Sequence, residues 1–284
     1  MASSSLILEG GGMRGIFTAG VLDYFLDKDL RFDHCIGVSA GSCHGCSYLS
    51  RQRGRAYRIT MENLKNKHYC SLYSLITTGD LFGVKFAYDE VPNRLYPFDH
   101  ETFNSCGTAF HVVVTNCITG KAEYPLMRDM NRDIVYVRAS SSLPLVSRLV
   151  HINGTPYLDG GISDSIPLRF SMEQGYEKPV VVLTQPKGYR KPPSSSVPLI
   201  RRLYAKYPKM VETIAHRHEV YNETLEELER LEAEGRVFVI RPQAALDVGR
   251  IEKNRDRLDA AYRQGYETAA RQFDALLAYL GSFL

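Results

Sequence analysis

The sequence predicts an α/β fold in three layers, in which helices cover both faces of a mostly parallel central sheet. Short apolar segments alternate with segments of helical period over the first 53 residues, which is the pattern of parallel sheets. Glycine-rich turns directly follow the first two apolar segments. A length of 284 residues with 44% hydrophobic content is enough to bury one large core.

The first half of the chain begins as strand, helix, strand, helix. Leu6–Leu8 is a short apolar run typical of a buried strand. Residues 16–26 repeat apolar side chains at helical spacing, and residues 34–38 form a second apolar run. A second helix is expected to run from there toward Arg53. This order favours a parallel sheet covered by helices.

Further strands are expected at residues 111–115, 134–137, 180–184 and 237–240, because each is apolar or rich in β-branched residues. Residues 61–103 are different, since they are rich in aromatic and turn residues and lack a regular period. We interpret them as an inserted cap that lines an acyl pocket. The apolar residues proposed for this lining are Leu72, Leu75, Ile76, Leu81 and Phe82.

The last third of the chain is predicted to be mainly helical. Residues 187–198 contain three prolines and three consecutive serines, which is typical of an exposed loop. Helices are expected at about 209–234, ended by Gly235, and at about 251–279. We therefore divide the chain into a core, residues 1–185, and an extension, residues 186–284, that packs on the core.

Composition excludes several classes of protein. The balance of 35 basic against 32 acidic residues, a formal charge of +3, is too weak to predict nucleic-acid binding. No stretch approaches the roughly 20 apolar residues needed to cross a bilayer, and the first residues lack the basic segment of a secretory leader. We expect a cytoplasmic protein, in peripheral contact with the inner membrane surface.

The six cysteines are expected to be reduced and largely buried, because no secretory leader is predicted. Cys43 and Cys46 have the spacing of half a zinc site. Both fall on the expected second helix, and no second pair of ligands has matching spacing. We therefore predict no metal site.

Ser39 lies in the pentapeptide Gly37-Val38-Ser39-Ala40-Gly41, between the second predicted strand and the helix that follows. A serine on such a tight turn is pushed out of the sheet, with the first N–H groups of the helix beside it. The glycines at Gly37 and Gly41 let the backbone pass closely through the turn. The pattern predicts a nucleophile.

A second glycine-rich turn, residues 10–15, follows the first strand. Consecutive glycines let backbone N–H groups converge on an anion, and such a donor contributes about 3 kcal/mol to a transition state. Gly10, Gly12 and Gly15 also satisfy the G-x-G-x-x-G pattern of dinucleotide-binding proteins. That interpretation requires an acidic residue at the end of the second strand, where this chain has Val38-Ser39. The turn is better interpreted as an oxyanion loop.

The general base is less evident. In the α/β-hydrolase order an acid and then a histidine follow the serine, yet the histidines beyond residue 151 are His216 and His218, on a predicted solvated helix face. Asp159, in Leu158-Asp159-Gly160-Gly161, follows a short apolar segment and precedes two glycines. Its alternative role is an ordinary Asp-Gly hairpin turn. We favour Asp159 as the partner of Ser39.

These three motifs, in this order, resemble the patatin-like phospholipases, a family that uses a serine-aspartate dyad. Gly10–Gly15 is similar to the family's oxyanion loop, preceded by Glu9 where many members have aspartate, and Gly37–Gly41 is similar to its nucleophile elbow. Asp159-Gly160-Gly161 is similar to its Asp-Gly-Gly element. The resemblance extends to the Ala-Ser-x-x-x-Pro stretch at 139–144 and to Pro167, and covers about residues 6–185. Residues 241–254 resemble, more weakly, bacterial members with a helical extension.

The resemblance implies a patatin-like fold and a lipid acyl hydrolase of the phospholipase A type. Ser39 would be the nucleophile and Asp159 the base, with no metal and no cofactor. The residues implied in oxyanion binding are Gly10, Gly11, Gly12, Met13, Arg14 and Gly15, and those of the elbow are Gly37, Val38, Ala40 and Gly41. An acyltransferase or thioesterase on the same site, or a non-catalytic lipid- or protein-binding module, are the alternative functions.

A membrane-facing surface is predicted between residues 189 and 209, where basic and aromatic side chains alternate. We expect it to contact anionic lipid. The sequence carries no signal for the oligomeric state. The residues of this predicted surface are Tyr189, Arg190, Lys191, Arg201, Arg202, Tyr204, Lys206, Tyr207 and Lys209.

Overall fold

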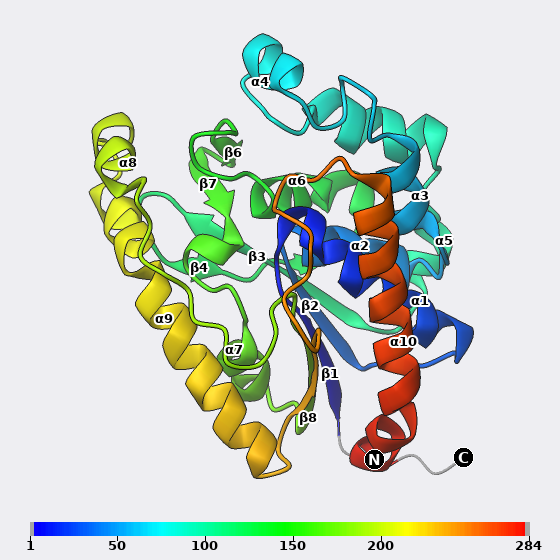
Figure 1. Ribbon diagram of the computed structural model, residues 1–284. Helices are drawn as coiled ribbons and strands as arrows, with labels where there is room; N and C mark the ends of the chain where they lie inside the picture. Colours follow the sequence, from blue (N-terminus) through cyan, green and yellow to red (C-terminus); the bar gives the residue numbers. More distant parts are fainter. Residues whose placement is uncertain (1–2, 282–284) are drawn as a thin grey trace.

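A nine-stranded sheet forms the middle layer of the computed structural model, which describes residues 3–281 (Figure 1). Its main path runs β6-β7-β3-β2-β1-β8-β9, and β4 and β5 pair with β3. The five strands from β3 to β9 along this path are parallel, whereas β7 and β6 are antiparallel at one edge. The strands are β1 (Ser4–Leu8), β2 (His34–Val38), β3 (Ala109–Asn116), β4 (Ala122–Glu123), β5 (Leu126–Met127), β6 (Val150–Ile152), β7 (Thr155–Asp159), β8 (Lys178–Val182) and β9 (Phe238–Ile240).

Helices cover both faces of the sheet, so the three-layer α/β prediction is confirmed. The α-helices are α1 (Ile16–Asp27), α2 (Ala40–Leu49), α3 (Arg55–Glu62), α4 (Leu72–Thr78), α5 (His100–Asn104), α6 (Met130–Ser140), α7 (Leu168–Glu173), α8 (Val197–Leu203), α9 (Pro208–Ala233) and α10 (Arg255–Leu280). Two 3₁₀ turns (Gly12–Gly15 and Gly160–Ile162) and a π-helical segment (Phe86–Leu95) complete the helical elements of residues 3–281.

Alternation along the strands divides the core in two. Leu6 and Leu8 of β1 point to one face and pack with Phe17 of α1 and with α10. Ile7, between them, points to the other face and packs in the cluster that includes Leu228 of α9. Every strand side chain named here is fully buried, and complete burial on both faces explains why these segments are apolar throughout.

The C-terminal third is integrated with the rest of the molecule. Strand β9 extends the sheet by pairing in parallel with β8. Helix α10 lies along α1 on one face, while α9 crosses the opposite face (Figure 1). Asn254 caps α10 by accepting hydrogen bonds from the N–H groups of Asp256 and Arg257. The extension therefore contributes to all three layers.

One predicted strand is wrong. Residues 134–137 lie inside helix α6 rather than in the sheet. The Asp129 side chain caps this helix through the N–H of Asn131, and Asp133 accepts from the N–H groups of Arg128 and Asp129. These caps fix the start of a helix, and they outweigh the β-propensity of the Ile-Val-Tyr-Val run that follows.

Residues 61–103 begin in the last turn of α3 and continue through α4 and the π-helical segment into α5. They lie on one side of the sheet (Figure 1). Helix α4 exposes its apolar side chains, with Leu72 66% and Ile76 76% exposed. Within residues 3–281, no helix combines the length and the apolarity that crossing a membrane requires.

Candidate active site

Ser39 stands at the turn from β2 into α2 with a backbone that few residues adopt. Its φ is 54° and its ψ is −121°, a strained conformation that the surroundings must hold. Gly37 and Gly41 make the turn possible, since a Cβ on Gly41 would lie 2.4 Å from the Leu8 oxygen and one on Gly37 2.5 Å from Cα of Ser42. The N–H of Ser39 donates to Oγ of Ser140 at 2.8 Å. The turn is thus fixed from two sides.

Asp159 ends strand β7 and is 2% exposed. Its N–H donates to the Ser142 oxygen at 2.8 Å, and its Oδ1 accepts from the N–H of Gly161 at 2.7 Å. Gly160 must lack a side chain, because a Cβ there would lie 2.1 Å from the Val113 oxygen. Within residues 3–281, Oδ2 has no well-formed hydrogen bond. Oδ1 is therefore held by the N–H of Gly161, while Oδ2 is free to accept a hydrogen bond.

The structure brings Ser39 and Asp159 together at one small cavity. Burial raises the pKa of the Asp159 carboxyl, while the Ser39 hydroxyl and the Arg217 guanidinium act in the opposite direction. A carboxylate with a raised pKa is a stronger base than an exposed aspartate. The geometry and the electrostatics both suit proton transfer from the serine hydroxyl.

The glycine loop lies beside Ser39, since a Cβ on Gly10 would lie 2.9 Å from Cβ of Ser39. Gly12 has a φ of 59°, and the N–H of Met13 donates to the Arg250 oxygen at 3.1 Å. The N–H groups of Gly11 and Gly12 make no hydrogen bond to any part of residues 3–281. Within the described residues these two N–H groups are free, whereas the N–H of Met13 is engaged.

Glu9 holds the loop in place. This buried side chain accepts hydrogen bonds from the N–H of Thr184 at 2.6 Å and from its hydroxyl at 3.0 Å. Its other oxygen accepts from the Tyr221 hydroxyl at 2.6 Å. Glu9 thereby joins the start of the glycine loop to the segment after β8 and to helix α9.

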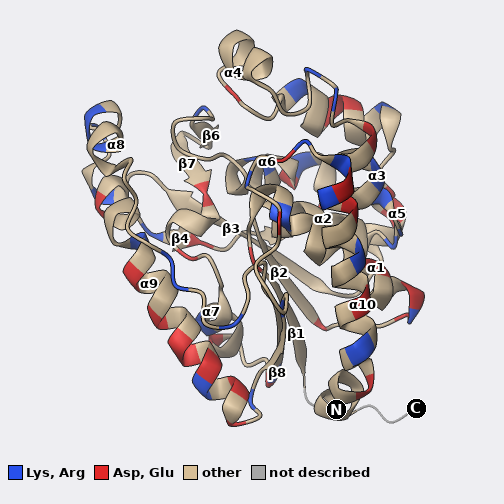
Figure 2. Ribbon diagram, in the orientation of Figure 1, with Lys and Arg blue, Asp and Glu red and all other residues tan. Residues whose placement is uncertain are grey.

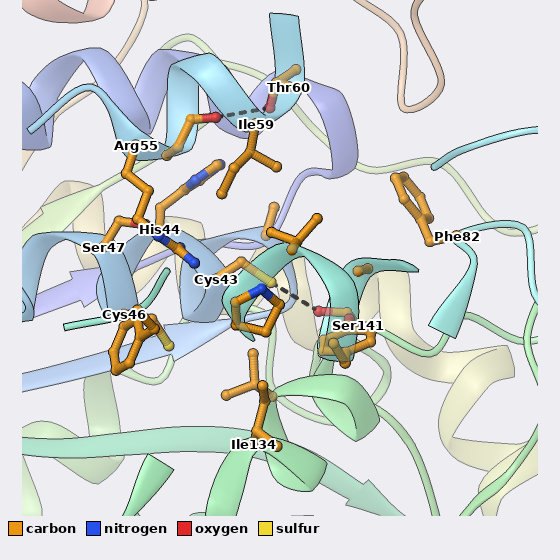
Figure 3. Close-up of a pocket in the computed structure, with 18 of the residues that line it drawn as sticks. Cys43, His44, Cys46, Ser47, Arg55, Ile59, Thr60, Phe82, Ile134 and Ser141 are labelled. Atoms are coloured by element: carbon orange, nitrogen blue, oxygen red, sulfur yellow. Dashed lines mark hydrogen bonds between the residues drawn. The ribbon is translucent and has the colours of Figure 1, made fainter. Parts of the chain in front are cut away.

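A larger cavity of about 280 Å³ opens on the other side of Ser39. Figure 3 shows its wall, with Ile59 of α3, Phe82 and Ile134 of α6 among the apolar side chains. Arg55 also lines it, and its guanidinium donates to the Tyr96 oxygen at 2.9 Å. The mainly apolar lining suits an acyl chain.

The wall of this large cavity partly matches the predicted cap. Phe82 lines it, together with further residues of the 61–103 segment: Tyr69, Ala87, Tyr88, Val91, Pro92, Asn93, Phe98 and His100. The other four residues proposed for the lining, Leu72, Leu75, Ile76 and Leu81, lie elsewhere. Two of them are on the exposed face of α4.

The small cavity behind Ser39 is lined by cations that sequence reasoning did not assign to the site: Lys191, Arg217 and Arg250. Arg14, which belongs to the predicted loop, lines it too. Lys191 belonged to the predicted membrane surface, but its Nζ lies 4.0 Å from the centre of the buried Tyr221 ring. These side chains come from loops and helices distant in sequence from Ser39, so no local motif signals them.

Histidines do not complete a triad with Ser39 and Asp159. His216 is exposed and pairs with Glu219, with Nδ1 2.9 Å from Oε2. His218 approaches the Ala215 oxygen on the same helix. His44 lines the large cavity, where burial lowers its pKa to about 4. Within the described residues, no three His, Cys, Asp or Glu side chains are grouped to hold a metal ion.

Comparisons with known proteins agree with this architecture. A family model described as patatin-like phospholipase matches residues 6–171, more than half of the chain. A second, described as a domain of unknown function (DUF6363), matches residues 207–281.

Two curated relatives are similar in sequence. "Uncharacterized protein YjjU" of Escherichia coli (strain K12) is 29% identical over 249 residues, covering 85% of this chain and 69% of that protein. "Probable lipid hydrolase 463L" of Invertebrate iridescent virus 6 is 26% identical over 191 residues, covering 61% and 65%. The crystal structure of VipD from Legionella pneumophila aligns with a TM-score of 0.49 and 13% identity, covering 96% of this chain and 67% of that one. The chain thus spans about two thirds of the length of each of the three.

Proposed function

Because the chain belongs to the patatin-like phospholipase family, we propose that it is a serine acyl hydrolase that cleaves acyl esters of lipids with a Ser39-Asp159 dyad. Family membership implies lipid acyl hydrolase activity. The dyad is supported by one observation above the others: a serine in a strained turn and a buried carboxylate with a free oxygen line the same cavity.

In the proposed reaction, Oγ of Ser39 attacks the carbonyl carbon of the ester while Asp159 accepts its proton. The N–H groups of Gly11 and Gly12 stabilise the oxyanion of the tetrahedral intermediate. Its collapse breaks the ester bond, and Asp159 returns the proton to the leaving alcohol. Water then attacks the acyl-enzyme, with Asp159 as base, and releases the fatty acid and the free serine.

A fluorophosphonate probe tests the nucleophile. It should label the native protein and leave Ser39→Ala unlabelled, whereas equal labelling of both proteins would place the nucleophile elsewhere. Asp159→Asn should keep the fold and lower kcat by at least about 1,000-fold. The matched control is Asp164→Asn, since Asp164 is a nearby carboxylate bonded to the Tyr124 hydroxyl. Its substitution should lower kcat far less.

A panel of acyl esters, phospholipids and acyl thioesters distinguishes the proposed hydrolase from a thioesterase, an acyltransferase and a binding module. We expect turnover of acyl esters with water as acceptor. Faster turnover of an acyl thioester with the same chain would favour a thioesterase, and transfer of the acyl group to an added alcohol would favour an acyltransferase. A protein that neither reacts with the probe nor turns over any ester would be a binding module.

Contact with an anionic membrane is also part of the proposal. Helix α8 exposes Leu199 and Leu203, 50% and 62% exposed, beside Arg201 and Arg202. Figure 2 shows the basic residues of α8, and Figure 1 shows α8 and α4 toward the end of the molecule to which the parallel strands point. Apolar side chains flanked by cations are typical of an interfacial surface.

Co-sedimentation with vesicles tests this contact. Replacing Arg201 and Arg202 with glutamate should weaken binding to vesicles that contain anionic lipid by at least about tenfold, since each nearby cation contributes about 1 kcal/mol. Arg230→Glu, on the distant end of α9, is the control. Binding that is indifferent to anionic lipid would remove the contact from the proposal.

A further inference from the structure

The small cavity behind Ser39 carries an excess of positive charge. Arg14, Lys191, Arg217 and Arg250 line it, against the carboxylates of Glu9 and Asp159. Both oxygens of Glu9 are already bonded to Thr184 and Tyr221. The four cations therefore outnumber the two carboxylates of the chamber by two charges.

These cations lack carboxylate partners within residues 3–281, although Arg217 donates to the Ser165 hydroxyl at 3.5 Å and Lys191 packs on the Tyr221 ring. Within residues 3–281, none of the four forms a salt bridge of 4.0 Å or less. The Nε atoms of Arg14 and Arg217 are buried and have no hydrogen-bond acceptor among the described residues. A buried cation without a partner is costly to folding, and an anion in the chamber would offset that cost.

Hydrogen bonds within the protein hold the residues of the chamber in place. The N–H of Lys191 donates to the Asn222 side chain at 2.8 Å, and that side chain donates back to the Lys191 oxygen at 3.1 Å. Arg250 is tied to the glycine loop, because its oxygen accepts from the N–H of Met13. A terminal nitrogen of Arg217 lies 3.1 Å from where a Cβ on Gly161 would stand. The backbones of Lys191 and Arg250 are therefore fixed, and the Arg217 guanidinium lies beside Gly161, two residues from Asp159.

Three of the four cations lie outside residues 6–171, the region that the patatin-like phospholipase model matches. Lys191, Arg217 and Arg250 follow residue 171, where that match ends. Arg217 lies within the second matched region, residues 207–281, and so does Arg250. The extension thus adds a charged half to a cavity whose other half is the glycine loop and the dyad.

We propose that this chamber binds the phosphate group of the substrate's leaving alcohol, and that the protein prefers acyl esters of phosphomonoester alcohols, such as lysophosphatidic acid, to neutral or zwitterionic lipids. The inference rests on the proposed hydrolase function. Ser39 lines both cavities, so an ester bond at Ser39 has its acyl chain in the large cavity and its alcohol in the chamber. Asp159 lines the chamber as well, where it returns the proton to that alcohol.

Size and charge favour a small anion. The chamber has a volume of about 30 Å³, against about 280 Å³ for the large cavity, so it is too small for a second acyl chain. Forked guanidinium groups bind phosphate oxygens with good geometry. Four cations match the double charge of a monoester better than the single charge of a diester, and they repel a choline group.

Phosphate binding should depend on pH through Lys191. Burial, with Arg217 next, lowers its pKa to about 7, and Glu9 acts in the opposite direction. Arg14 and Arg250 also lower it, and the Tyr221 and Tyr189 rings pack against it. Lys191 loses its charge as the pH rises through 7, so at equal concentrations of the phosphate dianion, which itself forms over this range, phosphate should bind more weakly at pH 8.5 than at pH 6.5.

A binding measurement tests the chamber without catalysis. Inorganic phosphate is titrated into Ser39→Ala protein by calorimetry, at constant ionic strength. Adding Arg217→Gln or Lys191→Gln should raise the Kd at least tenfold. Arg190→Gln should not, because that neighbouring side chain pairs with Glu229. If Arg217→Gln fails to fold, Arg250→Gln replaces it, since it keeps the backbone bond to Met13. Absence of phosphate binding, or equal Kd values for Arg217→Gln and Arg190→Gln, would overturn the proposal.

An activity measurement tests the leaving group. The ratio of kcat/KM for lysophosphatidic acid to that for a monoacylglycerol of the same chain should exceed ten, and Lys191→Gln should lower it at least tenfold. Phosphate binding with an equal ratio would assign the chamber to a free phosphate ligand and overturn the leaving-group assignment. Phosphate binding by a protein that hydrolyses no ester would refute the proposed function instead, while hydrolysis of the neutral ester without phosphate binding would refute this inference alone.

Discussion

Gly20 of α1 and Gly265 of α10 let the two helices approach until backbone meets backbone. A Cβ on Gly20 would lie 2.0 Å from the Tyr262 oxygen, and one on Gly265 would lie 2.0 Å from the Phe17 oxygen. Backbone atoms of two packed helices cannot give way as a side chain can. This crossing fixes the C-terminal helix on the first helix of the chain.

Gly20→Ala should therefore destabilise the protein by about 2–3 kcal/mol, as overpacked cores do, although alanine is the better helix former. Urea unfolding measures the change. Gly45→Ala is the matched control, because its Cβ would meet Cε2 of the Phe110 ring at 3.0 Å, a side-chain contact that is longer than the backbone contacts of Gly20. Equal stability of Gly20→Ala and the parent would show that the helices can separate without cost.

Ser140→Ala should lower kcat by about tenfold and leave KM nearly unchanged, since misplacing a catalytic group reduces the rate of the chemical step. The Ser140 hydroxyl accepts from the N–H of Ser39 and so holds the strained turn. Ser142→Ala is the control, because its hydroxyl bonds to the Arg138 oxygen while its backbone oxygen still holds Asp159. Steady-state kinetics of the two variants would contradict this role if both lost the same activity.

The activity on a neutral ester should fall on the acid side with an apparent pKa above the ordinary aspartate value of 3.8. Asp159 must be ionised to accept a proton, and burial raises its pKa. Arg217 opposes that rise, so Arg217→Gln should move the acid limb to higher pH. The pH profile of kcat/KM for both proteins measures the shift. An unmoved limb would show that Asp159 is not the titrating base.

Folding stability should decrease as the pH falls from 6.5 toward 3. Burial, with His111 beside it, lowers the pKa of His34 to about 3, whereas in the unfolded chain the value is about 6.5. Between these values the unfolded state binds a proton that the folded state refuses, which costs up to about 1.4 kcal/mol per pH unit. Urea unfolding across this range should show a shallower pH dependence for His34→Gln. An unchanged slope would assign the acid sensitivity to other groups.

Ile134→Trp should shift the preference toward shorter acyl chains, because Ile134 lines the large cavity and a larger ring fills it (Figure 3). Ile134→Val, the matched control, should tolerate chains at least as long as the parent does. Comparing kcat/KM over a series of esters of increasing chain length measures the preference. The same optimum in all three proteins would place the acyl chain elsewhere.

Much of the fold could be predicted because the buried strands are short apolar runs between turns. Residues 34–38 are an example, since the expected bounds agree with β2. The helix at 134–137 could not be predicted, because its signal lies in the Asp129 and Asp133 caps and not in its apolar residues.

The candidate site likewise contains residues that have a local sequence signal and residues that only tertiary packing brings there. Ser39 and Asp159 could be proposed because local turn chemistry surrounds each, and they remain proposals until tested. Lys191, Arg217 and Arg250 reach the same place only through the packing of α9 and of the segment before α10. A lysine among basic neighbours is typical of a solvated surface, so its burial against Tyr221 could not be read from the sequence.

The position of β1 has a consequence for how the chain folds. This first strand carries the glycine loop and lies between β2 and β8, yet β8 is made only after the family match has ended. Until β8 arrives, one edge of β1 offers unpaired backbone groups to any other chain. Pairings between such distant segments form late in folding. A nascent chain released before β8 would therefore hold its glycine loop on an open edge and aggregate, and the loop takes its final shape only late in synthesis.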